Sequence, residues 1–344
     1  MSETKRTELS TLGEFGLIAK LTENVEIKHD STYKGIGDDA AVLDKEDHFQ
    51  LISTDMLMEG VHFNLMYCPL KHLGYKSIVV NLSDIYAMNG TPEYVTVSIA
   101  VSNRFSLEAL EEFYEGVNLA CKLYNVDLIG GDTTSSMSGF AISVTAVGRV
   151  KKDKISYRSG AQENDLLVVT GDLGAAYMGL QILEREKKVF ETAPSTQPDL
   201  AGKDYILERQ LKPEARKDII AMFEKMGLRP TSMIDISDGL ASECIHIAKA
   251  SDKGFTIYED KVPIDPTTFS SAREFNLDPI TCALNGGEDY ELLFTIDQAD
   301  HEKVKGNPNM TFIGHITDKA SGYQMISTGG SSVDVTAQGW DPIK

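Results

Sequence analysis

The sequence predicts an α/β protein of two domains, and three observations support this expectation. Hydrophobic residues make up 42% and charged residues 25% of the 344 residues, the balance of a globular protein. Strand-like and helix-like segments alternate along both halves of the chain. A lysine-rich stretch at residues 151–154 marks a change in composition between the halves. We therefore expect an N-terminal domain over residues 1–150 and a C-terminal α/β domain over residues 151–344.

The N-terminal half is expected to contain two helices and several strands. Hydrophobic residues between 74 and 88 recur at helical spacing. Between 93 and 101 they recur at every second position, which predicts a strand. Ser106 is a suitable N-cap for a helix that ends near Tyr124. Further strands are expected over residues 50–54, 126–129 and 141–150.

The C-terminal half repeats this alternation. A glycine-rich turn at 171–174 separates a strand from a helix over 175–184. Residues 186–203 are charged and contain two prolines, which favours a surface loop. Other helices are expected over 214–226 and from about Asp238, and other strands over 165–170, 232–236, 255–258 and 292–296.

The charge of the chain excludes several functions. With 33 Lys and Arg against 52 Asp and Glu, the formal net charge is −19, which opposes nonspecific binding to nucleic acid or to anionic membranes. No hydrophobic run approaches the roughly 20 residues of a membrane span, and no secretory signal is visible. The four cysteines are widely spaced, so buried free thiols in a reducing compartment are favoured. We therefore expect a cytoplasmic protein.

Acidic residues recur after short hydrophobic runs and beside Gly, Ser or Thr. Any one such motif is explained by a turn or a helix cap, but the set together favours a site where several Mg²⁺ ions bridge carboxylates to phosphates. Carboxylates gathered in one cleft would otherwise repel one another. The motifs are Gly35–Asp39, Leu51–Asp55, Leu128–Asp132, Met233–Gly239 and Asn285–Tyr290.

Two residues and one motif leave alternatives open. Asp84 is opposite the hydrophobic stripe of its predicted helix, so a solvated position is an equally simple interpretation. Two roles are open for His62, a structural one and a contact to a ligand. The segment Gly35–Ala40 fits a dinucleotide-binding fingerprint, but its two Asp would repel a pyrophosphate and no clear strand precedes it. The P-loop, protein-kinase and G-x-S-x-G signatures are absent from the sequence.

Taken in order, the motifs resemble the thiamine-monophosphate kinase family. This family is a branch of the superfamily of aminoimidazole ribonucleotide synthetase, selenophosphate synthetase and a hydrogenase-maturation protein. The resemblance extends from Gly13 to Trp340, with some departure in the last residues after Trp340. The stretches that carry it are Gly37–Ala41, Ser53–Asp55, Glu59–Phe63, Asn81–Asp84, Gly130–Thr134, Arg158–Ala161, Asp235–Leu240 and Gly286–Leu292.

The resemblance implies transfer of the γ-phosphoryl group of ATP to thiamine monophosphate, and two domains whose N-terminal sheets pair into a barrel across a homodimer. It places ATP contacts at Tyr114, Gly131, Asp132, Arg158 and Ser237, and substrate contacts at His62, Glu288 and Trp340. The implied Mg²⁺ ligands are Asp38, Ser53, Thr54, Asp55, Asp84, Asp132, Asp235 and Asp238.

Phosphate chemistry makes a catalytic side chain unnecessary for this reaction. The second pKa of a phosphate monoester is about 6, so the acceptor oxygen is largely ionised at pH 7 and needs no general base. We therefore expect direct, metal-assisted transfer. Arg158 would supply positive charge at the nucleotide, and the ring of Trp340 would stack on the cationic thiazolium.

The sequence lacks the features that are typical of the alternative functions. Selenophosphate synthetases normally carry a reactive residue near the N-terminus, whereas no cysteine precedes Cys68, and the hydrogenase-maturation branch ends in a cysteine-bearing tail. A selenophosphate or aminoimidazole ribonucleotide synthetase-like enzyme is the remaining alternative. A noncatalytic divalent-ion binder would show D-x-D-x-D-G loops, which this sequence lacks. A glycosidase would be expected to have more than the single tryptophan found here, because sugars stack on such rings.

Overall fold

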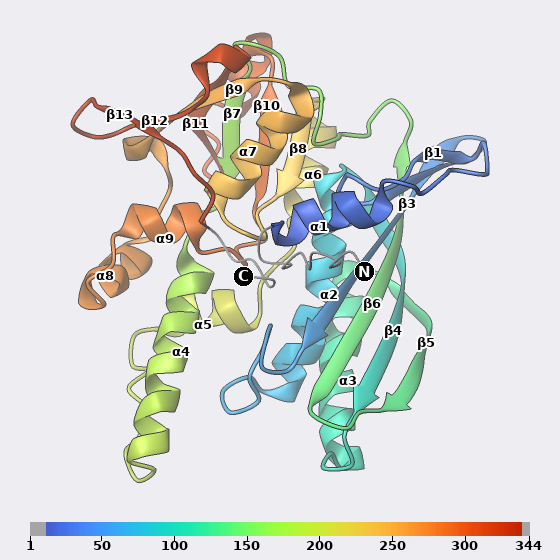
Figure 1. Ribbon diagram of the computed structural model, residues 1–344, viewed down its shortest axis with the longest axis vertical. Coiled ribbons are helices and arrows are strands. Elements are labelled where there is room, and N and C mark those ends of the chain that lie inside the picture. Colours follow the sequence, from blue (N-terminus) through green and yellow to red (C-terminus); the bar gives the residue numbers. More distant parts are fainter. Residues whose placement is uncertain (1–11, 339–344) are drawn as a thin grey trace, which may run out of the picture.

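Helix α2 (Leu70–Ala87) packs against two β-sheets in the computed structural model, which describes residues 12–338 (Figure 1). Nearly all of α2 is buried. Because one helix contacts both sheets, its side chains can reach both sides of the junction between them. Trp340 lies outside the described residues.

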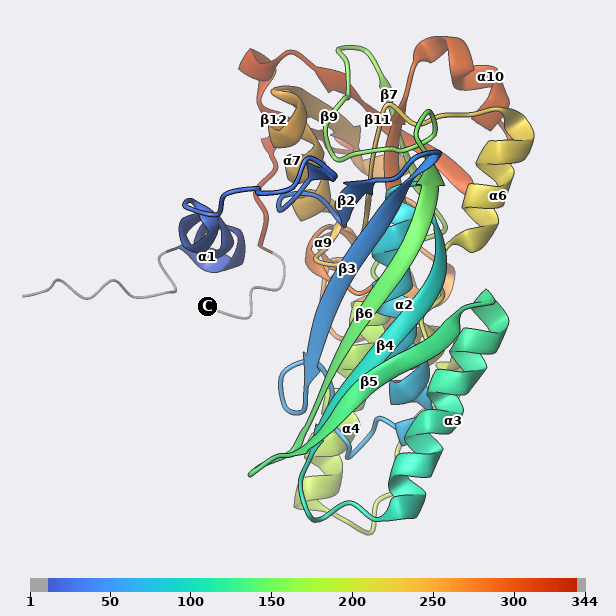
Figure 2. The ribbon, with the colours of Figure 1, turned by 90° about the vertical axis from the view of Figure 1, so that its right-hand side faces the viewer.

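The first sheet has the strand order β1-β2-β3-β6-β4-β5. All its pairs are antiparallel except the parallel pair of β4 and β5, which helix α3 connects. Its elements are β1 (Thr32–Lys34), β2 (Ala41–Asp44), β3 (His48–Met58), β4 (Thr91–Val101), α3 (Leu107–Tyr124), β5 (Asp127–Ser135) and β6 (Phe140–Lys151). Helices α2 and α3 lie on one face of this sheet, and no helix of the described residues covers its other face (Figure 2). We call this second face the uncovered face.

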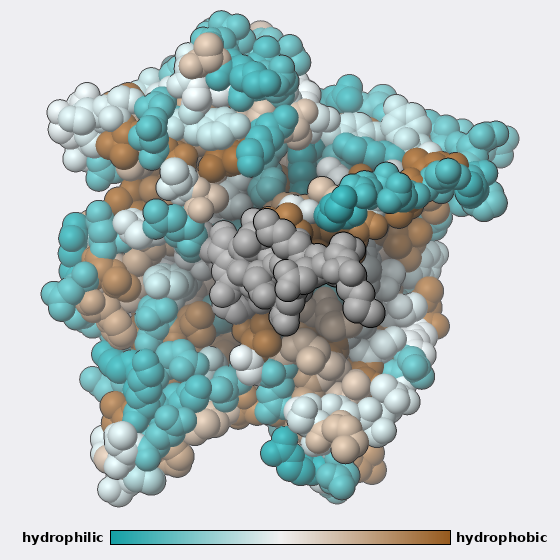
Figure 3. All heavy atoms as spheres, viewed as in Figure 1, coloured by the Kyte–Doolittle hydropathy of each residue, from teal (hydrophilic) through white to brown (hydrophobic). Residues whose placement is uncertain are grey.

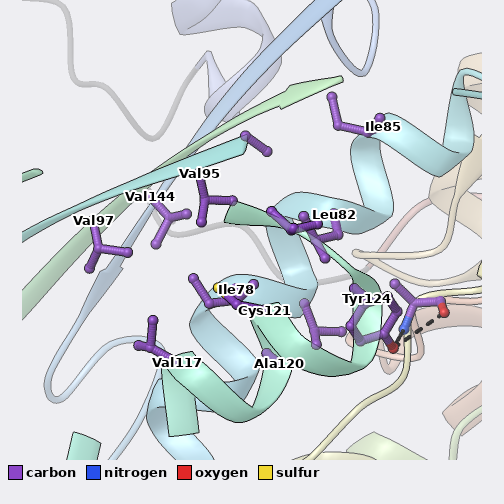
Figure 4. Close-up of a cluster of buried hydrophobic side chains, with 14 of the residues drawn as sticks. Ile78, Leu82, Ile85, Val95, Val97, Val117, Ala120, Cys121, Tyr124 and Val144 are labelled. Carbon is purple, nitrogen blue, oxygen red and sulfur yellow. Dashed lines mark hydrogen bonds between the residues drawn. The ribbon is translucent and has the colours of Figure 1, made fainter. Parts of the chain in front are cut away.

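The core of this unit lies between the sheet and the two helices (Figure 4). Val95, Val97 and Val144 of the sheet meet Ile78 and Leu82 of α2. The two helices pack so closely that a Cβ atom on Gly116 would lie 1.9 Å from the carbonyl oxygen of Lys71. Ser106 accepts a hydrogen bond from the amide of Ala109, which confirms the predicted N-cap of α3.

The second sheet has the order β13-β12-β9-β11-β7-β10-β8. Its strands are β7 (Leu166–Thr170), β8 (Ser232–Asp235), β9 (Gly254–Tyr258), β10 (Leu292–Ile296), β11 (Met310–Thr317), β12 (Tyr323–Ile326) and β13 (Ser332–Asp334). The helices of this unit are α4 (Ala175–Thr192), α5 (Asp204–Leu211), α6 (Lys217–Met226), α7 (Leu240–Ser251), α8 (Pro266–Glu274), α9 (Pro279–Asn285) and α10 (His301–Val304).

Helix α1 (Gly13–Thr22) lies across the junction of the two units. The ring of Phe15 contacts that of His246 on α7, with centroids 4.1 Å apart. Figure 3 shows hydrophobic residues beside the hydrophilic outer side of this helix. Among the described residues, no helix has both the length and the hydrophobicity to cross a membrane.

Three predicted boundaries are wrong. The strand expected over 50–54 is β3, which extends to Met58, so Asp55 lies inside the strand and not after it. Residues 186–192 are not a loop, because α4 continues through them to Thr192. The strand expected over 126–129 continues as β5 to Ser135, so Gly130, Gly131 and Asp132 lie inside the strand and not after it. The four cysteines are free and buried, as expected.

Candidate active site

A cavity of about 1410 Å³ lies between the two units. Both units and helix α1 contribute to its walls. It brings together most of the residues that the sequence singled out. These are Asp38, Ser53, Thr54, Asp55, His62, Asp84, Arg158, Asp235, Ser237, Asp238 and Glu288.

Three carboxylates from distant parts of the chain form the centre of the cavity. Asp39 comes from the loop between β1 and β2, Asp84 from α2 and Asp235 from the end of β8. One carboxylate oxygen of each lies within 4.8 Å of those of the other two. This spacing allows a single cation to contact all three. Sequence reasoning assigned Asp84 and Asp235 to metal and passed over Asp39, although Asp39 adjoins Asp38 in the same motif.

Burial makes this grouping of negative charge unfavourable in the absence of a cation. Burial, followed by the charges of Asp55, Asp235 and Asp39, raises the pKa of Asp84 well above its usual value. Burial likewise raises the pKa of Asp39 to about 7 and that of Asp235 to about 6. Carboxyl groups with raised pKa values in a cavity are the arrangement that a divalent cation relieves.

Beside the acidic centre, helix α2 is hydrogen-bonded both to strand β3 and to the second unit. Asn81 accepts a 3.0 Å hydrogen bond from the backbone amide of Asp55 on β3, and Asp84 accepts one from the hydroxyl of Ser53. Ser83, on the adjacent side of the helix, donates to Asp235. Asp84 is therefore not on a solvated face, and that alternative is wrong.

The guanidinium group of Arg158 is hydrogen-bonded to the carboxylate of Asp39. Its Nη2 and Nε atoms donate to Oδ1 of Asp39 at 2.7 and 3.2 Å. Oδ2 of Asp39 is buried and has no hydrogen-bond partner among the described residues. Asp38 accepts from the backbone amide of Arg158 and from Lys34. One oxygen of the buried Asp39 carboxylate thus remains available to a ligand.

His62 and Glu288 both line the cavity. Nδ1 of His62 accepts a 3.0 Å hydrogen bond from the amide of Met58, and burial lowers the pKa of His62. Glu288 lies in the loop between α9 and β10 and has a left-handed backbone, with φ of 58°. Its amide donates to the carbonyl of Ser237, which joins this loop to the motif at 235–239.

At the start of α7, Glu243 holds the backbone next to Asp238. Oε1 of Glu243 accepts a 3.0 Å hydrogen bond from the amide of Asp238. Glu243 is buried, and burial followed by the charge of Asp238 raises its pKa well above the usual value. Sequence reasoning missed this residue, because a glutamate in the first turns of a helix is common.

The remaining predicted ATP residues lie elsewhere on the same chain. Tyr114, Gly131 and Asp132 line a second hollow, whose lining shares no residue with the cavity. The strand register aligns Asp132 with Ser98, Ser143 and Met56, which places it three strand positions from β3. At about 4.8 Å per strand, that separation is roughly 14 Å.

Strand alternation also separates the side chains of the predicted metal ligands. Ser53 and Asp55 point towards α2, while Thr54 points to the uncovered face, where its hydroxyl contacts Val144 and Thr145. Asp132 is on the uncovered face as well, by its register with Met56. Within one chain, these two side chains are therefore not part of the acidic centre.

Three further residues in and beside the cavity, Glu14, Gln210 and Lys76, had no signal in the sequence strong enough to find them, and Tyr290 was noted only as part of the motif Asn285–Tyr290. Glu14 of α1 is close enough to Asp55 to raise its pKa, after burial, to about 6. Gln210 of α5 and Tyr290 also line the cavity, and Lys76 is paired with Glu288. Helix spacing and segment order say nothing about such cross-domain neighbours.

A family model matches most of the first unit, which contributes part of this acidic cavity. Residues 37–150 match the family model described as AIR synthase related protein, N-terminal domain. The hydrogenase maturation protein HypE in complex with ATP shares the fold, with a TM-score of 0.68 at 16% identity and coverage of 98% of this chain and 99% of that one.

The chain belongs to the thiamine-monophosphate kinase family. It is 34% identical to thiamine-monophosphate kinase of Bacillus subtilis (strain 168), over 97% of this chain and 100% of that protein. Identity to the kinase of Aquifex aeolicus (strain VF5) is 35%, over 90% and 93% of the two chains. The solved structure described as AaThiL complexed with AMPPCP and TMP superposes with a TM-score of 0.83 at 33% identity and covers 99% of both chains.

Proposed function

We propose that this protein uses ATP to phosphorylate thiamine monophosphate, giving thiamine diphosphate. The observation that carries the proposal is the group of Asp39, Asp84 and Asp235, whose oxygens lie within 4.8 Å of one another in a cavity open to a ligand. Family membership supports the choice of substrates, as does the solved neighbour that holds AMPPCP and TMP.

Mg²⁺ suits the donors of this cavity. They are carboxylate and hydroxyl oxygens, which hard cations prefer, and the buried Oδ2 of Asp39 has no partner among the described residues. Bound Mg²⁺ would neutralise charge on the transferred phosphoryl group and hold the leaving diphosphate. The residues proposed to hold it within one chain are Asp38, Asp39, Ser53, Asp55, Asp84, Asp235 and Asp238. Thr54 and Asp132, whose side chains lie on the uncovered face of the first sheet, would contribute only across the proposed dimer interface.

The protein's own part in the reaction is to orient two phosphate compounds. The acceptor phosphate is its own nucleophile, because its second pKa of about 6 leaves it ionised at neutral pH. We propose transfer in a single in-line step with no phosphorylated protein intermediate. Arg158 and Ser237 contact the nucleotide, and His62 and Glu288 contact the thiamine end. The proposed stacking of Trp340 on the thiazolium lies outside the described residues.

We further propose that the active protein is a homodimer whose N-terminal sheets close into a barrel. The uncovered face of the first sheet supports this, as does the edge strand β5, which is exposed along its whole length. A dimer would also explain the position of Tyr114, Gly131 and Asp132, which cannot share an ion with Asp55 in one chain. The partner's copies of these three residues would complete the nucleotide site.

The test is the reaction itself. Purified protein is incubated with ATP, Mg²⁺ and thiamine monophosphate, and thiamine esters are separated as fluorescent thiochrome derivatives. Thiamine diphosphate that forms only when protein, ATP and Mg²⁺ are all present is the expected result. Hydrolysis of ATP without formation of thiamine diphosphate would refute thiamine monophosphate as the acceptor but would still support the nucleotide site. Absence of both activities would refute the proposal.

A further inference from the structure

Helix α1 forms part of the wall of the acidic cavity, although it belongs to neither sheet. Its residues Glu14, Phe15 and Ile18 line the cavity. They share one face of the helix, because positions three and four apart are neighbours on a helix surface. Figure 1 shows α1 lying across the junction of the two units. The helix therefore covers one side of the site where the carboxylates gather.

The attachment of α1 to the rest of the protein is slight. All ten residues of the helix are described, and only Gly13 among them is buried. Leu12, at the N-cap, offers no side-chain hydrogen bond to the first turn. Residues 23–31, which connect the helix to β1, form neither helix nor strand and are all exposed. A helix of ten residues is marginal in water by itself, so α1 depends on its contacts with the cavity wall.

The ring of Phe15 attaches α1 to the second unit. It packs on the ring of His246, with centroids 4.1 Å apart. Burial, followed by the charges of Arg158 and Lys249, lowers the pKa of His246 to about 4, so the imidazole is uncharged at neutral pH. The contact joins two uncharged rings, and it therefore favours the position of α1 whether or not the cavity holds cations.

Glu14 has the opposite effect, because it brings a negative charge to a site that is already acidic. Its charge is near enough to Asp55 to raise the pKa of that carboxyl group, after burial itself. Asp55 in turn acts on Asp84, one of the three carboxylates of the centre. Without cations these charges repel Glu14 and with it α1, whereas a divalent cation between Glu14 and Asp55 replaces repulsion by attraction.

We propose that α1 is a lid whose closure depends on cations. When Glu14 and Asp55 share bound Mg²⁺, the helix stays over the cavity; without Mg²⁺ it lifts away and the exposed segment 23–31 bends. The cation is that of the proposed function, on which this inference rests. A closed lid keeps water from the transferred phosphoryl group, so that the acceptor phosphate receives it and water does not.

Hydrogen exchange, measured by mass spectrometry on the full-length protein, tests the lid without turnover. Exchange at the amides of α1 is compared at pH 8 in EDTA, in Mg²⁺ alone, and in NaCl at the ionic strength of the Mg²⁺ sample. We expect Mg²⁺ to slow this exchange by about 10-fold or more, because a released helix of this length loses its hydrogen bonds. Helix α8, which does not line the cavity, should exchange equally in all three.

Glu14→Gln removes the charge at nearly constant size and should act in both conditions. In EDTA the α1 amides of this variant should exchange more slowly than those of the unaltered protein, because the repulsion is weaker. The ratio of the exchange rates in EDTA and in Mg²⁺ should fall towards one. Glu23→Gln is the matched control, since Glu23 follows the other end of the helix, pairs with Lys20 at 2.8 Å and is not part of the cavity wall. Its ratio should equal that of the unaltered protein.

Phe15→Ala removes the ring that packs on His246 and tests the exclusion of water. In this variant α1 should exchange faster in both EDTA and Mg²⁺. The amount of ATP hydrolysed per thiamine diphosphate formed should rise several-fold, because the lid is open more often. Phe190→Ala, which removes an exposed ring near the end of α4, should change neither quantity.

Equal exchange of α1 in EDTA and in Mg²⁺ would overturn the inference, as would equal protection by NaCl or an undiminished ratio in Glu14→Gln. Unchanged hydrolysis of ATP in Phe15→Ala would refute the exclusion of water by α1. Exchange that depends on Mg²⁺ in a protein that forms no thiamine diphosphate would instead support the lid and refute only the proposed reaction.

Discussion

The hydroxyl of Ser83 donates a 2.6 Å hydrogen bond to Oδ2 of Asp235, and so joins helix α2 of the first unit to strand β8 of the second. Asp84, the next residue on α2, lies in the same acidic group as Asp235. The contact between Ser83 and Asp235 therefore constrains the distance between two carboxylates that come from different units, one on helix α2 and one at the end of strand β8. Helix α2 is the element on which the geometry of the whole site depends.

Asp55→Asn should lower kcat by a factor of about 100 or more and weaken the dependence of the rate on Mg²⁺, because it removes a carboxylate from the metal site. Asn is the same size, and the backbone amide of residue 55 still donates to Asn81, so the fold should be retained. Steady-state rates measured over a Mg²⁺ titration test the activity, and circular dichroism tests whether the fold is retained. Asp252→Asn, which alters an exposed carboxylate paired with Lys319, is the control. Turnover near that of the unaltered protein would contradict the metal assignment.

The stability of the metal-free protein should fall as pH rises from about 4 to about 7 because of the acidic centre. Asp39, Asp55 and Asp235 have pKa values raised to about 7, 6 and 6. In this range the folded protein holds protons that the unfolded chain has released, so a higher pH favours unfolding. The readout is the difference in unfolding temperature, in EDTA, between the unaltered protein and Asp55→Asn.

That difference should change mainly between pH 4 and 6, with the variant the more stable at the higher pH. Saturating Mg²⁺ should reverse the order at pH 8 and raise the unfolding temperature of the unaltered protein by roughly 3–6 °C. A difference independent of pH would show that Asp55 titrates normally.

Gly116→Ala should destabilise the first unit by about 1–3 kcal/mol or more, because the added methyl group meets the backbone of α2. The new Cβ would lie 1.9 Å from the carbonyl oxygen of Lys71 and 2.8 Å from the amide of Tyr75. Displacement of α2 moves Asp84, so kcat should fall together with stability. Denaturant unfolding and activity are measured on the same samples. Gly329→Ala, where the nearest neighbouring atom is 3.8 Å away, should change neither.

Ser98→Arg should convert the proposed dimer into a monomer. Ser98 is in β4 and shares the uncovered face of the sheet with Ser143, so a long charged side chain there would block closure of the barrel. The mass from light scattering should fall from twice the 37.8 kDa of the chain to a single chain, with loss of activity. Asn118→Arg, on the exposed side of α3, adds the same charge as a control. A monomeric, active unaltered protein would refute the dimer.

Much of the secondary structure was predictable because its signals are local. The hydrophobic spacing of residues 74–88 located α2, and Ser106 marked the start of α3. The continuation of α4 to Thr192 was missed because charged residues suggested a loop, yet they form a solvated helix equally well before Pro194. Helix α5 was missed altogether, since eight residues carry little periodic signal.

The chain order of its motifs was enough to place this protein in its family, and the chemistry of phosphate and magnesium explains why those motifs are acidic. The sequence alone therefore determined the residue types of the site and the kind of ligand they suit. Tertiary structure decided which of them meet: Asp39 joined Asp84 and Asp235, while Asp132 was carried three strands away. It also placed Lys76 and Gln210 against Glu288. Ligation depends on distances of a few ångströms, which arise from the packing of α2 between two sheets and not from separation along the chain.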